Sequence, residues 1–171
     1  MLSLQSINLV QMALIKSISG IRGTIGGSTG NNLTPLDIVK FTAAYGTWLA
    51  QQGKSKKAGE ACKVVVGRDG RISGLMVKNI VNATLSSLGI DVIDLDFSTT
   101  PTVEMAVTFL KADGGIILTA SHNPKEWNAL KLLNHKGEFI SGDEGKLILD
   151  IAEKEAFDFV HVDKLGNIST H

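Results

Sequence analysis

The segment Val64-Val-Val-Gly-Arg-Asp-Gly-Arg71 joins a short, continuously apolar run to a turn of glycine and charged residues. An apolar run of this length, bounded by turn residues, is typical of a strand buried on both faces of a sheet. Apolar residues recur with helical spacing from Val77 to Leu88, and Gly89 ends that pattern. The segment therefore predicts a strand, a turn and a helix in succession, the repeating unit of an α/β protein.

The same alternation of strand and helix continues on both sides of this segment. The further strands that the sequence predicts lie near residues 14–19, at 90–97 and at 115–119, and the further helices at 35–52, 100–111 and about 141–155. Connections of helical length argue for parallel strands with helices on both faces. Residues 130–133 and 138–140 flank a turn and predict a hairpin. We expect a three-layer α/β/α fold with a mostly parallel, four-stranded mixed sheet plus a hairpin.

The chain divides into three parts. Its 171 residues suit one domain and are enough to bury a core. Residues 1–12 are interpreted as an N-terminal extension that need not be ordered, and residues 13–155 as the domain. In residues 156–171 the pattern thins out, as expected of a tail that leads from a first domain toward a second.

Composition excludes several classes of partner. The 17 basic residues balance 17 acidic ones, so there is no electrostatic case for nucleic acid or an anionic membrane as a partner. Cys62 is the only cysteine, which excludes an internal disulfide and favours a cytoplasmic location. The first eleven residues lack a basic region and a long apolar run, so they predict neither a signal peptide nor a membrane span.

Ligands of open α/β sheets bind beyond the carboxyl ends of the strands. The segments that leave such ends are residues 20–27, 67–71, 98–101 and 120–128. The first of these segments contains four glycines in eight residues, Gly20, Gly23, Gly26 and Gly27. We expect it to be a loop, because glycine at this density loses too much entropy in a helix or strand.

The segment Thr119-Ala-Ser-His-Asn-Pro124, here called the serine loop, places a hydroxyl, an imidazole and an amide beside a proline. Neighbouring residues of an extended chain point to opposite sides, so His122 is poorly placed as the base of a serine hydrolase at Ser121. Phosphoryl chemistry fits better, because a phosphoserine carries a charge of about −1.5 to −2 and cations lie in or beside the candidate loops. These cations are Arg22, Arg68, Arg71, Lys125 and Lys131.

Three motifs carry a more specific resemblance. They are Ser19-Gly-Ile-Arg-Gly23, Gly67-Arg-Asp-Gly-Arg71 and the serine loop, which Asn128-x-x-Lys131 follows. In this order they resemble the first domain of the α-D-phosphohexomutases. The resemblance implies that the full-length protein interconverts hexose 1-phosphate and hexose 6-phosphate through a bisphosphate. The sugar stays open, since glucose, mannose and glucosamine phosphates are all used in the family.

The resemblance also implies catalytic roles for matching residues. Ser121 would be the phosphoserine that donates its phosphoryl group to the sugar. Lys131 would help the sugar hydroxyl to lose and regain its proton, with Arg22 beside it. The family usually has glycine where this chain has Ala129, so the backbone near Lys131 is a point to compare with the structure.

Four further residues are candidates for substrate binding or for shaping the loop. His122 and Asn123 match family positions that shape the serine loop by hydrogen bonds. Arg68 and Arg71 leave two interpretations open. Each arginine can form an ion pair within its own turn, or it can contact the substrate or a neighbouring domain.

Family members have four domains, so the resemblance implies that this chain is domain I and that domains II–IV of the same protein are its partners. Mg²⁺ is implied as a cofactor, with the phosphate on Ser121 as one ligand and aspartates of domain II as others. A hexose 1,6-bisphosphate is implied as activator. We expect the fragment alone to be inactive and to self-associate weakly through the rim that would meet domain II. The alternative is a non-catalytic phosphoprotein or sugar-phosphate-binding module.

Overall fold

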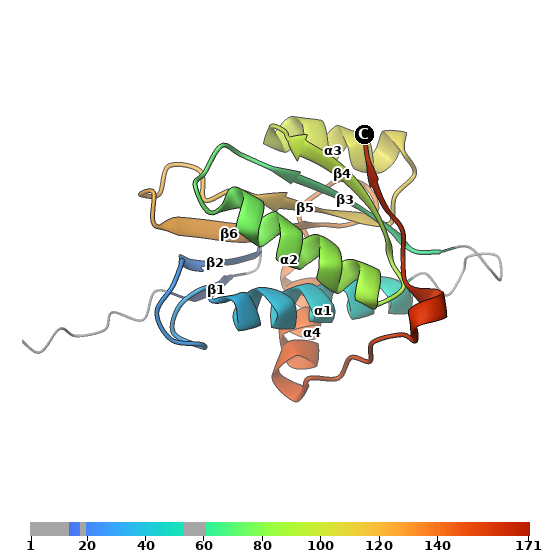
Figure 1. The fold of residues 1–171 in the computed structure, drawn as a ribbon, viewed down its shortest axis with the longest axis horizontal. Coiled ribbons are helices and arrows are strands. Elements are labelled where there is room, and N and C mark those ends of the chain that lie inside the picture. The colour runs from blue at the N-terminus through green and yellow to red at the C-terminus, as the bar shows by residue number, and fades with distance from the viewer. Residues whose placement is uncertain (1–13, 18–19, 53–60) are drawn as a thin grey trace, which may run out of the picture.

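A mixed β-sheet forms the middle layer of the computed structural model, which describes residues 14–17, 20–52 and 61–171 (Figure 1). The strands are β1 (Ile15–Ser17), β2 (Gly20–Thr24), β3 (Lys63–Arg68), β4 (Asp91–Phe97), β5 (Gly114–Leu118), β6 (Trp127–Leu133) and β7 (Ile168–Thr170). Their spatial order is β1-β2-β6-β5-β3-β4-β7. The predicted N-terminal extension, residues 1–12, lies outside the described residues.

The sheet has a parallel half and an antiparallel half. β5, β3, β4 and β7 run parallel to one another, whereas β1, β2, β6 and β5 pair in the antiparallel sense. Strand β3 is buried along its length from Val64 to Arg68, as its continuous apolar run predicts. Val64 and Val66 pack on one face of the sheet and Val65 packs on the other.

Helices cover both faces. They are α1 (Pro35–Gln52), α2 (Gly74–Ser87), α3 (Thr100–Phe109) and α4 (Gly142–Lys154), and a short 3-10 helix, η2 (Val162–Lys164), follows. The larger core cluster contains side chains of α1, α2 and α4, whereas the smaller cluster contains those of α3. The prediction of a three-layer α/β/α fold is therefore confirmed. No described helix has an apolar stretch of the length that crossing a membrane requires.

Local signals placed the helices well. At α4 a capping box begins the helix, since Glu144 N donates to Ser141 Oγ and Ser141 N donates to the Glu144 carboxylate. Tyr45 and Trp48 of α1 are buried. The Tyr45 hydroxyl lies 2.7 Å from Leu133 O, and burial raises the pKa of this phenol well above its ordinary value. This contact fixes α1 against the sheet.

The glycine-rich run was wrongly predicted to be all loop, because residues 20–24 form strand β2 beside β6. Gly20 has a φ of +142°, and a Cβ there would lie 2.1 Å from Leu130 O and 3.0 Å from Lys131 Cα. Glycine is thus what allows the two backbones to approach. The glycines that follow, Gly26, Gly27 and Gly30, do form a turn with positive φ.

Two strands that the sequence did not predict, β2 and β7, complete the sheet. The second arm of the predicted hairpin forms only an isolated bridge, between Leu133 and Phe139, so β6 itself is the antiparallel strand. Residues 168–170 of the tail form β7 and add a parallel edge to β4. Four predicted strands therefore become seven, because the glycine-rich run and the tail add β2 and β7 and the first hairpin arm counts as β6.

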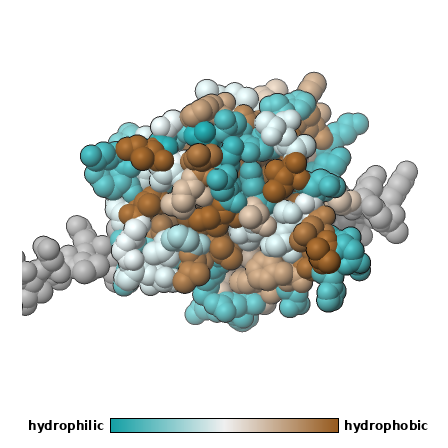
Figure 2. All heavy atoms as spheres, in the orientation of Figure 1, coloured by the Kyte–Doolittle hydropathy of each residue, from teal (hydrophilic) through white to brown (hydrophobic). Residues whose placement is uncertain are grey.

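Apolar side chains also reach the surface. Figure 2 shows hydrophobic residues scattered among hydrophilic ones on the face that carries α1 and α2. Ile72, just before α2, is 87% exposed, and Phe97 at the end of β4 is 66% exposed. Isolated exposed apolar residues are normal on a protein surface, so they do not by themselves identify an interface.

The close approach at Gly20 gives a first prediction. Gly20→Ala should lower the free energy of unfolding by about 3 kcal/mol, because the new methyl group forces β2 away from β6. Gly26→Ala is the matched control, since Gly26 also has a positive φ (+93°) but nothing lies within 4 Å of its Cβ position. We expect it to cost only about 1 kcal/mol. Urea unfolding measures both, and equal losses would contradict the packing explanation.

Candidate active site

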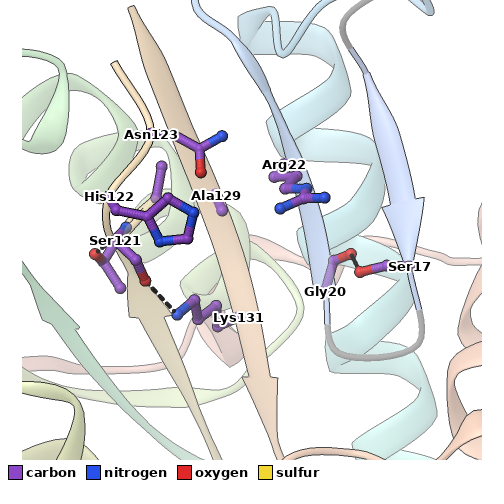
Figure 3. Close-up of a pocket in the computed structure, with 10 residues that line it drawn as sticks. Ser17, Gly20, Arg22, Ser121, His122, Asn123, Ala129 and Lys131 are labelled. Carbon is purple, nitrogen blue, oxygen red and sulfur yellow. Dashed lines mark hydrogen bonds between the residues drawn. The ribbon is translucent and has the colours of Figure 1, made fainter. Parts of the chain in front are cut away.

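A pocket of about 410 Å³ opens where β2, β6 and the serine loop meet (Figure 3). It lies beyond the carboxyl end of β5, as expected for a ligand site in this class of fold. The residues that line it are Ser17, Gly20, Arg22, Thr119, Ala120, Ser121, His122, Asn123, Ala129 and Lys131. Three predicted catalytic residues and both predicted loop-shaping residues of the serine loop are therefore brought together.

Ser121 has an unusual backbone conformation. Its φ is +53°, in the left-handed region that residues other than glycine and asparagine seldom adopt. Its amide donates to Thr119 Oγ1 at 3.0 Å, and Asn123 N donates to Ala120 O at 3.0 Å. Such a conformation costs on the order of 1 kcal/mol and persists only where the surroundings enforce it. The exposed Ser121 side chain is thus held in one orientation by a closed turn.

Lys131 contacts the serine directly. Its Nζ donates to Ser121 Oγ at 2.9 Å. Lys131 pairs with Gly20 across β6 and β2, and Ala129 pairs with Arg22. Because paired residues point to the same face of a sheet, Arg22, Ala129 and Lys131 share one face. The strand runs without interruption through Ala129, so alanine at the family's glycine position does not move Lys131 out of reach of Ser121.

The remaining pocket residues differ in how they are held. The side chain of Arg22 is exposed and forms no hydrogen bond or ion pair with the described residues, so its charge is available to a ligand. Figure 3 shows Arg22 on β2 and His122 on the serine loop at opposite sides of the pocket. His122 is exposed and makes no hydrogen bond within the described part of the chain. Asn123 contributes through its backbone, which bonds to Ala120 O and to Arg71.

Arg71 lies behind the serine loop. Its Nη1 donates to Pro124 O and Trp127 O at 2.8 and 2.9 Å, and its Nη2 donates to Ser121 O and Asn123 O, both at 2.8 Å. Its Nε faces Asp69 Oδ2 at 3.3 Å. The structure thus places Arg71 in contact with the loop backbone, and it is not among the residues that line the pocket.

Arg68 points elsewhere. Its Nε donates to Asp96 Oδ1 at 2.8 Å, and its guanidinium lies 3.8 Å from the centre of the Phe97 ring. Lys78 joins this cluster through Asp94 at 2.9 Å and Asp96 at 3.0 Å. The structure therefore does not bring Arg68 into the pocket, and its ion pair is with Asp96 of β4 and not within its own turn.

The charges of this cluster stabilise one another. A hydrogen bond from Lys78, supported by one from Arg68, holds the pKa of Asp96 below its ordinary value. Burial lowers the pKa of Lys78, but its hydrogen bonds to Asp94 and Asp96 outweigh that effect and leave the pKa raised. Both shifts favour the charged forms of Asp96 and Lys78, so their ion pair is stable at neutral pH at the end of β4.

Three residues of the site were not assigned a role from the sequence. Thr119 Oγ1 accepts a hydrogen bond from the Ser121 amide. Ser17 lines the pocket, and its hydroxyl donates to Gly20 O at 2.9 Å. Asn128 is fully buried and donates to Ser73 Oγ at 2.9 Å, which links β6 to the start of α2. Thr119 and Asn128 belong to quoted motifs, whereas nothing in the sequence marks Ser17.

A second pocket of about 410 Å³ lies on the other side of the serine loop. It is lined by Asp69, Gly70, Arg71, Ile72, Ser121, Asn123 and Lys125. Ser121 therefore borders both pockets. Within the described ranges, no three His, Cys, Asp or Glu side chains are close enough together to hold a metal ion.

Comparisons with known proteins agree on one family. The model of the family "Phosphoglucomutase/phosphomannomutase, alpha/beta/alpha domain I" matches residues 14–159. A phosphoglucomutase/phosphomannomutase of Thermococcus kodakarensis is 35% identical over 148 residues, which cover 85% of this chain and 31% of that protein. A probable phosphoglucosamine mutase of Methanosphaera stadtmanae is 35% identical over 157 residues, which cover 89% of this chain and 32% of that protein.

Solved structures agree on the fold. A putative phosphomannomutase from Thermus thermophilus matches with a TM-score of 0.74 and 28% identity, over 93% of this chain and 33% of that one. A phosphoglucomutase/phosphomannomutase family protein from Burkholderia thailandensis shows the same fold, with a TM-score of 0.74 at 24% identity over 95% of this chain and 33% of that one. The chain spans about a third of the length of these relatives.

The Asp96 cluster predicts a pH dependence of stability. The folded pKa of Asp96 lies below the unfolded one, so its carboxylate stabilises the fold above about pH 4, and this stabilisation is lost as the pH falls through the folded pKa. Asp96→Asn should therefore unfold at lower urea than wild type at pH 7, with the difference closing as the pH falls through the folded pKa of Asp96. Asparagine suits the left-handed φ of 51° at this position.

Glu153→Gln is the control for this measurement, because Glu153 is an exposed carboxylate on α4. It should leave the urea midpoint close to wild type over the same pH range. A gap between Asp96→Asn and wild type that stays constant over the whole acid range would show that ionisation of Asp96 is not its cause.

Proposed function

The chain belongs to the phosphoglucomutase/phosphomannomutase family as an alpha/beta/alpha domain I, and from this premise we propose that it is the phosphoserine-bearing domain of a phosphohexomutase. In the full-length protein, Ser121 would exchange a phosphoryl group with a hexose phosphate. The net reaction would interconvert hexose 1-phosphate and hexose 6-phosphate through a hexose bisphosphate.

The observation that carries this proposal is the contact of Lys131 Nζ with Ser121 Oγ inside a pocket that Arg22 also lines. A serine hydroxyl with a lysine at 2.9 Å can exchange a proton when its oxygen leaves or attacks phosphorus. Phosphoryl transfer otherwise depends on positioning and on neutralising the charge of the phosphate oxygens. Arg22 and Lys131 supply positive charge from neighbouring strands on the sheet face that the pocket exposes.

The proposed half-reaction balances its protons. A sugar hydroxyl oxygen attacks the phosphorus of phosphorylated Ser121, and the bond between phosphorus and Ser121 Oγ breaks. The Lys131 ammonium gives a proton to the leaving Oγ, and the resulting amine takes the proton from the attacking hydroxyl. The product bisphosphate then returns its other phosphoryl group to Ser121 by the reverse steps. A hexose 1,6-bisphosphate would accordingly act as activator by phosphorylating Ser121.

Mg²⁺ is proposed as a cofactor of the full-length protein, where it would neutralise phosphate charge. The described residues do not form a site for it by themselves, since they hold no cluster of carboxylates or histidines of the required size. A phosphate on Ser121 would be one ligand, and aspartates of domain II would be the others. We therefore propose that the fragment alone is inactive and that further domains complete the site.

Two lesser proposals concern the surroundings of the protein. We propose a cytoplasmic location, on the basis of a single cysteine in a chain of balanced charge. We also propose weak self-association of the isolated domain, through exposed apolar residues such as Ile72 and Phe97 near the second pocket and the end of β4. Sedimentation of the 171-residue chain at increasing concentration measures this association.

Transfer to Ser121 is testable with glucose 1,6-bisphosphate as donor. Incubation of the full-length protein should add one phosphate to Ser121, and peptide mapping by mass spectrometry should locate it there. Ser121→Ala should abolish both the added phosphate and mutase activity. Ser28→Ala, which removes another exposed serine hydroxyl, should leave both unchanged.

The outcomes also separate the alternatives. An unmodified Ser121, with the Ser121→Ala variant as active as wild type, would contradict the phosphoserine mechanism. Binding of a sugar phosphate without any turnover would favour the non-catalytic module. A serine hydrolase, in which Lys131 would be the base, should instead react with an organophosphonate probe at Ser121.

The role of Lys131 gives a separate prediction. Lys131→Arg keeps the positive charge, but a guanidinium does not release a proton at neutral pH. If Lys131 moves protons, this variant and Lys131→Met should both lose about 10²- to 10⁴-fold in kcat of the mutase reaction. An arginine variant that keeps wild-type kcat while the methionine variant is inactive would show that Lys131 acts only as a fixed cation.

A further inference from the structure

The two Nη nitrogens of Arg71 have no free N–H group for a substrate. A guanidinium offers five N–H donors, of which four are on Nη1 and Nη2. Those two nitrogens donate to the four carbonyls of Ser121, Asn123, Pro124 and Trp127, at 2.8 to 2.9 Å. The fifth donor, on Nε, makes no hydrogen bond, but it is buried 3.3 Å from Asp69 Oδ2, and the side chain is only 11% exposed. Arg71 therefore cannot bind a phosphate and hold these carbonyls at the same time.

The acceptors of Arg71 extend from the serine loop to β6. They begin at Ser121 and end at Trp127, the first residue of β6, so one planar group ties Ser121 to the start of that strand. Arg71 holds the Ser121 carbonyl, and Thr119 Oγ1 accepts a hydrogen bond from the Ser121 amide. Both peptide groups that flank the Ser121 Cα are thus held, and together they maintain its φ of +53°.

This backbone conformation decides where Ser121 Oγ lies. In the observed conformation the hydroxyl accepts from Lys131 Nζ at 2.9 Å. If the carbonyl of Ser121 were released, the residue would relax toward a negative φ, which is lower in energy for an L residue. The side chain would then leave the direction of Lys131. The four bonds from Arg71 therefore act on the distance between the reactive hydroxyl and the lysine.

Arg71 itself is anchored to a rigid part of the fold. Its amide donates to Asp69 Oδ1 at 3.0 Å, and its carbonyl accepts from Gly74 N at 2.9 Å, at the first turn of α2. Asp69 N in turn donates to Leu118 O at 3.1 Å, at the end of β5. The turn after β3 is thus fixed to the strand that precedes the serine loop.

We propose that Arg71 is a positioning residue, which holds Ser121 in its reactive conformation through the loop backbone and does not bind the phosphate of the substrate. This inference rests on the proposed phosphoryl transfer by Ser121. It excludes contact with the substrate, one of the roles that the sequence left open for Arg71. It also predicts that a lysine cannot replace this arginine, because one ammonium cannot reach four carbonyls in a plane.

The test compares wild type with Arg71→Lys in the full-length protein. In single-turnover phosphorylation of Ser121 by glucose 1,6-bisphosphate, the limiting rate constant should fall about 100-fold, the effect of a misplacement of about 1 Å. The half-saturating concentration should stay within about threefold of wild type, since Arg71 makes no contact with the ligand. Millimolar guanidinium should restore part of the rate to Arg71→Ala by filling the vacated position.

A second readout does not depend on the reaction. Amide hydrogen exchange of the peptide covering residues 119–127, measured by mass spectrometry without any ligand, should be faster in Arg71→Lys than in wild type. Arg68→Lys is the matched control. It removes a guanidinium at the end of β3, just before the same turn, and that guanidinium pairs with Asp96 and not with the serine loop. It should lower the unfolding midpoint and leave exchange of residues 119–127 as in wild type.

The two readouts separate failure of the inference from failure of the proposed function. A half-saturating concentration raised tenfold or more, with an unchanged limiting rate, would make Arg71 a substrate-binding residue and overturn the inference. Unchanged exchange of residues 119–127 in a folded Arg71→Lys would overturn it as well. If wild type accepts no phosphate on Ser121, the proposed function fails, and loop exchange still decides whether Arg71 holds the loop. If Arg71→Lys does not fold, Asp69→Asn replaces it, with the same changes expected at smaller size.

Discussion

The parallel pairing of β3 with β5 is the constraint on which the site depends. Its register sets Arg68 opposite Leu118, so the turn after β3 and the serine loop after β5 leave the same edge of the sheet together. Arg71, three residues beyond the end of β3, is thereby within reach of the loop carbonyls. A shift of one residue would turn these side chains to the opposite face and separate the turn from the loop.

The antiparallel half of the sheet supplies the positively charged side chains of the pocket. Pairing of β2 with β6 brings Arg22 and Lys131 to one face, and the close approach at Gly20 makes that pairing possible. The parallel half thus orients the serine through its backbone, and the antiparallel half surrounds it with positive charge. Neither half forms the pocket alone, since its lining combines β2, β6 and the serine loop.

The parts of the fold that sequence could predict are those with local causes. Buried strands such as β3 can be predicted from a continuous apolar run, and capped helices such as α4 from apolar spacing and capping residues. Strand β2 could not be predicted, because its glycines are required by close packing against β6, more than a hundred residues away. Strand β7 could not be predicted either, because it is a short exposed edge strand without an apolar pattern. Motifs identified Ser121 and Lys131, but the role of Arg71 stayed open, because backbone carbonyls leave no mark on the sequence.

Ser121 stands between two pockets, so the serine has a front and a rear compartment. A sugar phosphate seated against Arg22 and Lys131 would occupy the front alone. Groups that reach Ser121 from the rear, past Asp69 and Lys125, would not compete with it for space. With two compartments, the proposed hexose bisphosphate could reorient on one side of Ser121 while the contacts that hold Ser121 stay intact on the other side.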